Sequence, residues 1–374
     1  MFRSTQSKFH GQNRKIHRSN VDWVTKDAYF QSHEKLLHIV RSNLLATKMD
    51  HYVPRLGNGF ENFIRRSWSD RAPTSLYSAV QELNFMVTLT ALLGDTLGDA
   101  KVDLQSVFHR FDSWFEIASS DIPHLFLWRF TSAKSALLQE LRKVVAKLPA
   151  DPSHDFPTTA EAMRKELGSD GLEHWLLAIM WAGEANAIPT LFWTLYYLLR
   201  NPDYNRQVQE QIQQVAGGRS LVELSYKELL SLSFLKNALD ESIRLHAPPM
   251  IVRGARQPVK VKDYVVPQGD FLCLSPFWTQ RDESMYSNPS QWSPQRWEDP
   301  ALRSSALFLA FGRGKYRCPG QSFAYCGMIL ALAQVMTLCS ISLVDNAEAV
   351  LDPNNLVGLN KPLEDIHVRI ELRH

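Results

Sequence analysis

The chain has 374 residues, of which 45% are hydrophobic and 21% charged, and its formal net charge at pH 7 is +2. These values are typical of a globular protein with a sizeable core, and the small net charge gives no indication of a nucleic-acid partner or of acidic substrates. Four cysteines, Cys273, Cys318, Cys326 and Cys339, lie in the last third of the chain without a CxxC pair. This distribution argues against a zinc site and against a secreted disulfide scaffold, and it favours a reducing compartment.

The N-terminal segment is locally basic, with five lysine or arginine residues among the first twenty positions. We interpret it as a solvated surface segment. The start of the chain lacks the apolar core of a signal peptide, and no apolar run approaches the ~20 residues of a membrane span. As given, the chain is expected to be soluble or at most peripherally attached to a membrane.

Helical periodicity dominates the first two thirds of the chain. In the stretch 134–148, leucines and valines recur at helical spacing along one stripe. Similar but less regular patterns predict helices over 27–47, 76–93, 102–118 and 202–215.

The longest predicted helix covers residues 171–200. It is apolar nearly all round, so we expect it at the centre of the fold. Pro189 lacks a backbone N–H and should leave the carbonyl of Ala185 without its helical partner, which predicts a local opening of this helix.

A further helix is predicted from its capping residues. Ser225 and Glu228 form an S-x-x-E capping box. We expect the helix to continue through His246 and to end at Pro248 and Pro249.

The character of the sequence changes after this helix. Residues 251–274 carry short β-branched runs interrupted by Pro and Gly, which predict small hairpin strands. Residues 282–310 show little periodicity, a helix is predicted from about Pro319 to Cys339, and IHVRIELR predicts a final strand. We find no internal repeat and no linker, so the sequence predicts one domain over residues 1–374, mainly α with a minor β part.

The loop FGRGKYRCPG combines glycines, basic residues and a lone cysteine directly before a predicted helix. A phosphate cradle, a metal ligand and a reactive thiolate are the three chemistries that use such a pattern. A P-loop requires G-x-x-x-x-G-K-[ST], whereas Gly314 and Lys315 are followed by Tyr316. Chelation by several side chains is excluded because Cys318 has no partner ligand nearby in sequence.

A single thiolate at Cys318 is the remaining interpretation. The N-terminus of a helix favours negative charge, and Gly314 and Gly320 allow backbone N–H groups to approach the sulfur closely. Such hydrogen bonds tune an iron bound to the thiolate, and the basic residues around Arg317 suit the carboxylates of an anionic cofactor. The combination indicates a haem with one cysteine axial ligand.

The pattern F-x-x-G-x-x-x-C-x-G, formed here by Phe311, Gly314, Cys318 and Gly320, resembles the haem-binding loop of the cytochromes P450. The resemblance implies the P450 fold, haem b as cofactor, these four residues around it, and Cys318 as the ligand of its iron. Many members have Arg two residues before the cysteine, where this chain has a tyrosine. Arg317 and Lys315, on either side of that tyrosine, are therefore the candidate partners of a haem propionate.

Three further residues match the family in the expected order. Glu241 and Arg244 form E-x-x-R in the capped helix, and Arg296 lies in SPQRW; the family pairs such residues as a Glu-Arg-Arg network under the haem. Glu and Arg three positions apart share a helix face, and a buried ion pair is costly unless other partners complete it. Arg253 lies where the family often has a propionate-binding arginine.

The long helix carries a fourth match that departs from the family pattern. The family usually shows [AG]-G-x-[DE]-T, and this chain reads Ala182-Gly183-Glu184-Ala185-Asn186. We expect Gly183 and the opened turn to make room for a bound oxygen ligand. The amide of Asn186 can donate to and accept from a water, so it is expected to act in place of the usual acid–alcohol pair. Glu184 is not assigned that role.

Asn186 followed by AIPTLFW is similar to the P450 subgroup of sterol 7α- and 12α-hydroxylases and prostacyclin synthase, and so are two further segments, FHRFDSWFEIASSDIPHLFLWRF and NLVGLNKPLEDIHVRIEL. Members of this subgroup begin with a membrane anchor, a first helix and part of a β-sheet, which this chain is expected to lack. A full-length version would then lie at the endoplasmic reticulum membrane, with no anchor in the present chain.

Three functional readings remain open from the sequence. The first, which we favour, is a monooxygenase that oxidises a steroid-like substrate or a secondary metabolite with O2 and electrons from NADPH–cytochrome P450 reductase. The second is a haem-thiolate isomerase that rearranges a peroxide without external electrons. The third is a truncated haem-binding or inactive fragment.

Overall fold

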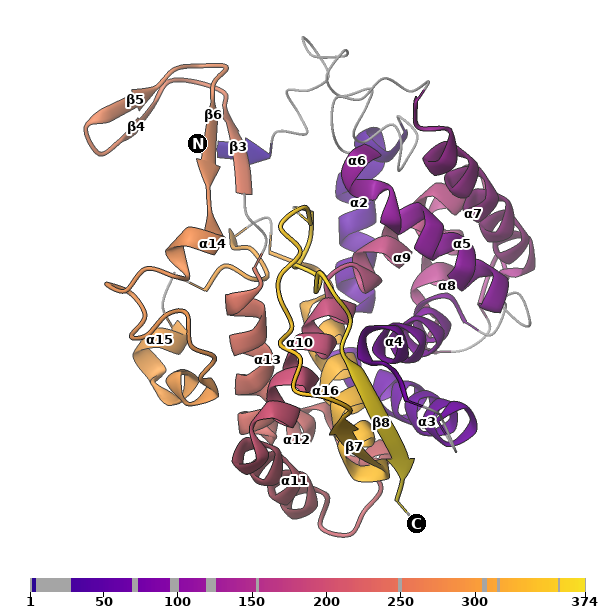
Figure 1. The fold of residues 1–374 in the computed structure, drawn as a ribbon. Coiled ribbons are helices and arrows are strands. Elements are labelled where there is room, and N and C mark those ends of the chain that lie inside the picture. The colour runs from indigo at the N-terminus through magenta and orange to yellow at the C-terminus, as the bar shows by residue number, and fades with distance from the viewer. Residues whose placement is uncertain are drawn as a thin grey trace.

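The computed structural model describes residues 2–4, 28–68, 73–94, 101–118, 126–152, 155–247, 251–304, 308–314, 317–355 and 357–373. Helices make up most of this part of the chain, and small sheets lie at its periphery (Figure 1). The fold class predicted from the sequence, mainly α with a minor β part, is therefore confirmed.

The helices and strands of the described residues have the following bounds. The α-helices are α2 (Ala28–Asn43), α3 (Met49–Ser67), α4 (Leu76–Leu93), α5 (Lys101–Ser113), α6 (Phe115–Ala118), α7 (Trp128–Lys147), α8 (Thr159–Leu167), α9 (Leu172–Glu184), α10 (Ala187–Arg200), α11 (Pro202–Ala216), α12 (Tyr226–Ser231), α13 (Ser233–Leu245), α14 (Pro276–Thr279), α15 (Pro300–Ser304) and α16 (Gln321–Leu338). Short 3-10 helices are η2 (Ala46–Lys48), η5 (Leu221–Glu223) and η6 (Pro294–Glu298). The strands are β1 (Phe2–Ser4), β2 (Thr74–Ser75), β3 (Ile251–Ala255), β4 (Val259–Val261), β5 (Tyr264–Val266), β6 (Phe271–Leu274), β7 (Cys339–Leu343) and β8 (His367–Leu372).

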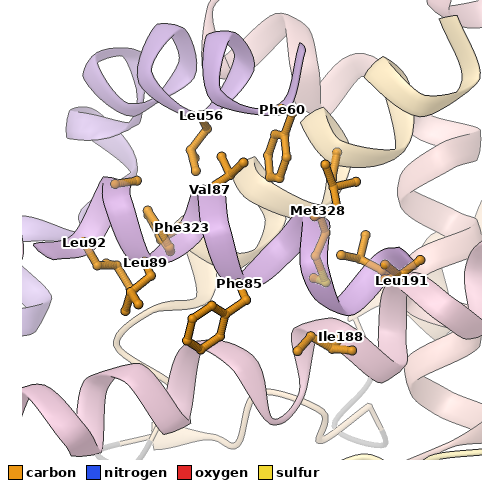
Figure 2. Packing of buried hydrophobic residues seen from close by; sticks show 14 of the residues in the cluster. Leu56, Phe60, Phe85, Val87, Leu89, Leu92, Ile188, Leu191, Phe323 and Met328 are labelled. Atoms are coloured by element: carbon orange, nitrogen blue, oxygen red, sulfur yellow. The ribbon is translucent and has the colours of Figure 1, made fainter. Parts of the chain in front are cut away.

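The core is built around α4, which packs against α3, α9, α10 and α16. Figure 2 shows Val87 of α4 pointing toward Leu56 and Phe60 of α3, while Phe85 points to the opposite side. All four side chains are buried. Because α4 is apolar on more than one face, it can be covered by helices from distant parts of the sequence at once.

The sheets are small and antiparallel. β3 lies between β1 and β6, and its pairing with β6 runs from Ile251 opposite Leu274 to Gly254 opposite Phe271. β8 lies between β2 and β7, so the C-terminal strand is the middle strand of its sheet. β4 and β5 form a hairpin that extends from the β3–β6 strands (Figure 1).

One helix agrees with the sequence-based expectation and another differs from it. The predicted helix 171–200 is interrupted between α9 and α10, close to Pro189, as the missing N–H of that proline led us to expect. The capping box of Ser225 and Glu228 is present, but the helix that it opens ends at Ser231, and α13 begins separately after Leu232. Pro248 and Pro249 lie outside the described residues.

Two core helices, α4 and α16, also differ from expectation in their length and hydropathy. Within the described residues, each is long and apolar enough to cross a membrane on those two criteria, unlike the prediction that no run approaches this length. In each, however, most of the apolar window is buried inside the protein, 67% in α4 and 78% in α16. Their apolar composition is explained by their central position.

Close packing around α3 leads to a first prediction. A Cβ on Gly57 would lie 2.6 Å from Cγ1 of Val222, in η5. Gly57→Ala should therefore lower the free energy of unfolding by about 1–3 kcal/mol, because the branched side chain of Val222 must shift to admit the added methyl group. Urea unfolding would measure this loss.

Gly327 of α16 is the matched control, because a Cβ there would meet nothing within 4 Å. Gly327→Ala should be neutral or stabilise the protein by up to about 1 kcal/mol, since alanine favours a helix over glycine. Equal effects of the two substitutions would show that the contact with Val222 is unimportant.

Candidate active site

The cysteine loop is shaped by its own backbone. Gly312 and Gly314 adopt φ values of +66° and +62°, a region that glycine enters without steric cost. The Cys318 N–H donates to the carbonyl of Phe311 at 2.7 Å, and the Arg317 N–H donates to the carbonyl of Gly314 at 3.1 Å. The loop therefore turns back on itself immediately before α16.

Cys318 is exposed, whereas Cys326 and Cys339 are buried. Protein atoms around the Cys318 sulfur nevertheless desolvate it and raise the pKa of the thiol, and the hydrogen bond from the Gly320 backbone N–H lowers that pKa by a smaller amount. That the helix terminus and nearby N–H groups favour the thiolate stays a prediction, and the Gly320 N–H acts in that direction. Coordination to a metal ion would deprotonate this thiol outright.

The other residues predicted to surround a haem lie on separate elements. The ring of Phe311 packs against Tyr325 of α16 with centroids 5.0 Å apart. The Nε of Arg317 donates to Oε1 of Gln321 at 2.7 Å, at the start of α16, whereas Arg253 lies in β3, in register with Leu272. Lys315 and Tyr316 lie outside the described residues.

The carboxylate of Glu241 is the centre of a buried network that includes both predicted arginines. Arg244 donates to it through Nε and Nη2, each at 2.9 Å, and Nε of Arg296 donates at 2.9 Å. Two donors that the sequence did not predict complete the shell: the Ser293 N–H at 2.9 Å and Nε1 of Trp297 at 3.0 Å. Five hydrogen bonds therefore replace the water that Glu241, with 0% of its side chain exposed, has lost.

Arg244 and Arg296 donate their other N–H groups to the irregular segment that follows α14. They donate to backbone carbonyls of Gln280 and Gln291 (from Arg244) and of Ser287, Asn288 and Gln291 (from Arg296). The guanidinium of Arg244 also lies 5.1 Å from the ring centroid of Tyr286. The network thus fixes a segment of little regular structure to α13.

The interruption between α9 and α10 exposes one side of an otherwise buried helix. Ala182 and Asn186, one turn apart, are exposed, whereas Glu184, Ala185 and Ile188 are buried. This exposed face is the part of α9 and α10 that can meet a ligand.

Gly183 lies on a different face of α9, toward α4. A Cβ on this residue would lie 3.5 Å from Leu92 and 3.9 Å from Thr88, both on α4. The structure therefore places Gly183 against α4, and Ala182 is the small residue that shares the exposed face with Asn186. That Gly183 makes room for a bound oxygen ligand stays a prediction.

Asn186 occupies the N-cap position of α10, but its side chain does not cap that helix. Its Oδ1 accepts a hydrogen bond of 3.1 Å from the Leu359 N–H in the C-terminal segment. Its own carbonyl accepts from the N–H and from the hydroxyl of Thr190, at 3.2 and 2.7 Å. The sequence predicted the importance of Asn186 but not its partner, 173 positions away.

Glu184 is a buried acid that the sequence analysis left without a role. Its side chain belongs to a residue only 1% exposed, and Oε2 accepts a hydrogen bond of 2.7 Å from Nδ2 of Asn84 on α4. Desolvation raises the pKa of Glu184 to about 8, with a further increase from Asp112 and a partial decrease from Asn84. An acid inside a nearly continuous apolar stretch was the available signal.

The Glu241 network leads to a prediction of stability. Glu241→Ala should destabilise the haem-loaded protein by about 3–5 kcal/mol, because it leaves two buried guanidinium groups without their counter-charge. Thermal unfolding and haem content measure the effect. Glu140→Ala, which removes a surface pair with Lys143, should cost below about 1 kcal/mol; a Glu241→Ala protein that is as stable and as haem-loaded as this control would contradict the prediction.

The buried acid leads to a prediction of pH dependence. The folded protein keeps the proton on Glu184 up to about pH 8, whereas the unfolded chain releases it near 4.5. Folding stability is therefore lost as the pH rises between these values, by a few kcal/mol, since one pKa unit corresponds to about 1.4 kcal/mol. Glu184→Gln removes this loss.

Urea unfolding at pH 5 and at pH 8 measures the difference. The stability of Glu184→Gln relative to the unsubstituted protein should increase from pH 5 to pH 8, and Glu140→Gln should show no such change. A pH-independent difference for Glu184→Gln would mean that Glu184 is ionised in the folded protein.

Comparison with known proteins agrees with this arrangement. The sequence model of the cytochrome P450 family matches residues 64–368. The 24-hydroxycholesterol 7-alpha-hydroxylase of Mus musculus is 29% identical over 364 residues, which cover 94% of this chain and 77% of the relative. The Homo sapiens enzyme of the same name is 27% identical, over 86% of this chain and 71% of the relative.

Among solved structures, retinoic acid-bound cyanobacterial CYP120A1 is similar in fold, with a TM-score of 0.81 at 17% identity. The similarity covers 100% of this chain and 85% of that structure. Because the family match extends over most of the chain and includes the cysteine loop, the protein belongs to the cytochrome P450 family of haem-thiolate monooxygenases.

Proposed function

We propose that this P450 hydroxylates, or otherwise oxidises, a steroid-like hydrophobic substrate with O2 and electrons from NADPH–cytochrome P450 reductase. The observation that carries the proposal is the similarity to 24-hydroxycholesterol 7-alpha-hydroxylases over 94% of the chain. The exposed face of the α9–α10 break, formed by Ala182 and Asn186, supports it. We place this activity at the endoplasmic reticulum membrane as part of the proposal.

The residues present fit haem b. Cys318 supplies an exposed thiol at the start of α16, with the Gly320 N–H directed to the sulfur, and a thiolate is the axial ligand that favours O–O cleavage. Phe311 and Gly314 would lie in the loop beside the haem, and Arg317 and Arg253 would bind its carboxylates. When bound, the haem supplies the activation of dioxygen and the transfer of oxygen to the substrate.

The chain's own contribution is mainly to orient groups near the substrate. Ala185 cannot transfer a proton, and the amide of Asn186 donates hydrogen bonds without releasing a proton at physiological pH. Asn186 Nδ2 would therefore hold a water or an oxygen acceptor in place, and the protons would come from water. Glu184 is buried against α4 and does not take the usual position of the acid.

A haem-thiolate isomerase is the second candidate. The observation that favours it is Asn186 itself, because the rearrangement of a peroxide imports its O–O bond and needs no acid–alcohol pair for proton delivery. The relatives named above are hydroxylases, so we place oxygenation first. A haem-binding protein without turnover is the third outcome that the experiment below distinguishes.

Isotopic labelling tests the proposed reaction. Haem-loaded protein, NADPH–cytochrome P450 reductase, NADPH and 18O2 are incubated with a panel of oxysterols, and the products are analysed by mass spectrometry. One 18O atom should enter the product in an NADPH-dependent reaction. Cys318→Ser, the control, should lose both this product and the red-shifted Soret band of the reduced, CO-bound protein.

Two other results would contradict the proposal. Turnover of an endoperoxide without NADPH and without 18O incorporation would assign the isomerase reaction. A thiolate-type CO spectrum without turnover of any oxysterol or endoperoxide would leave haem binding as the function.

A further inference from the structure

The C-terminal segment 352–361 lies against the α9–α10 break and contacts it through its backbone. The Leu359 N–H donates to Oδ1 of Asn186 at 3.1 Å. Nε1 of Trp193 on α10 donates to the carbonyl of Asn360 at 2.8 Å, and the Asn360 N–H donates to the carbonyl of His246 at 3.1 Å. The segment is thus bonded to α10 and to the end of α13 as well as to Asn186.

The bond from Leu359 determines which way the Asn186 amide points. An asparagine at an N-cap usually accepts from the first turn of its own helix, but Asn186 makes no such bond. Because Oδ1 accepts from Leu359, rotating the amide by 180° would set two N–H donors against each other. The NH2 group is therefore the part of the amide that remains for a ligand.

We propose that segment 352–361 fixes Asn186 as a hydrogen-bond donor at the exposed face of the α9–α10 break, with Gly358 and Glu116 as positioning residues. The ligand recognised there is an oxygen acceptor, such as bound dioxygen or a peroxide oxygen of a substrate. The nature of the reaction rests on the proposed function, but the orientation of the amide does not.

Gly358 allows the close approach that this geometry requires. Its φ is +79°, and a Cβ would lie 3.4 Å from both the carbonyl oxygen of Ala185 and Oδ1 of Asn186. The first of these atoms is the carbonyl that Pro189 leaves without a helical partner. A side chain at Gly358 would contact both oxygens directly and would be strained by the positive φ, so we expect it to shift the neighbouring Leu359 N–H.

Glu116 of α6 anchors the other end of the segment. Its Oε1 accepts from Nδ2 of Asn355 and from the Val357 N–H, both at 2.7 Å. Oδ1 of Asn355, which is buried, accepts in turn from the Lys361 N–H at 2.8 Å. These bonds close the segment into a loop with Gly358 and Leu359 between its anchors.

A second anchor comes from α5. Nζ of Lys361 pairs with Oδ2 of Asp112 at 2.5 Å, and Oδ1 of the same carboxylate accepts from Nε1 of Trp181 on α9 at 3.2 Å. Asp112 therefore ties the loop to the helix that precedes the break. The loop is held directly from α5, α6 and α10, and through Asp112 it is linked to α9, which explains how its backbone can fix one side chain.

The infrared stretching frequency of CO bound to the haem reports the orientation of the Asn186 amide, and its measurement requires neither substrate nor reductase. A hydrogen-bond donor near bound CO lowers this stretching frequency, because it strengthens back-donation from the iron. In haem-loaded protein reduced with dithionite, Asn186→Asp should raise the frequency, since its carboxylate still accepts from Leu359 but cannot donate. Asn186→Ala should raise it as well.

Gly358→Ala tests the positioning role directly. It should broaden the infrared band of CO or split it into two, as the amide adopts more than one orientation, and it should lower the product formed per NADPH at least threefold. Gly217→Ala is the matched control, because Gly217 also has a positive φ, +58°, but nothing lies within 4 Å of its Cβ position. Gly217→Ala should leave the infrared band of CO and the product formed per NADPH unchanged.

Glu116→Ala is the second positioning variant, for the case that Gly358→Ala does not fold. It should broaden the CO band in the same way, with Glu140→Ala unchanged. An unshifted band in Asn186→Asp and Asn186→Ala would overturn the donor role. A normal band in Glu116→Ala or Gly358→Ala would overturn the positioning role. If the bands change as expected but no 18O enters a product, the proposed function fails and the inference stands.

Discussion

The hydrogen bonds to the buried carboxylate of Glu241 are the interaction on which the packing of residues 280–291 against α13 depends. This carboxylate accepts five hydrogen bonds, from two guanidinium groups, one indole and one backbone N–H. In a site without water, each of these donors must be provided by the protein, or the charge becomes very costly. The arginines use their other N–H groups on backbone carbonyls of 280–291. A segment with little secondary structure is therefore held to α13, and it leads into the cysteine loop.

The part of the site around Asn186 depends on the interruption between α9 and α10. Pro189 removes one backbone donor, α9 and α10 separate, and the C-terminal segment fills the opening with the backbone of Gly358 and Leu359. Two parts of the chain that are remote in sequence, the α9–α10 break and the C-terminal segment, thus meet at Asn186. Both parts of the site follow the same physical rule: irregular backbone is tolerated inside the protein where side chains or neighbouring backbone satisfy its polar groups.

Short sequence patterns made several of the site residues predictable. Cys318, Gly314 and Gly320 could be interpreted because their chemistry depends on neighbours within a few positions, and Glu241 with Arg244 because three positions on a helix bring side chains together. The same reasoning could not show that Gly183 faces α4, since the orientation of a buried helix depends on the helices packed around it. It also missed the end of α12 at Ser231, since one capping box marks the start of a helix and says nothing of its length.

The sequence by itself determined the type of secondary structure, the family, the thiol at Cys318 and the presence of a break near Pro189, because each of these is encoded in spacing over a few residues. Only the tertiary structure decided the orientation of the Asn186 amide, the burial of Glu184 against Asn84 and the completion of the Glu241 shell by Trp297. Hydrogen bonds and desolvation act over a few ångströms in space, and in these cases the partners lie between 56 and 173 positions apart along the chain.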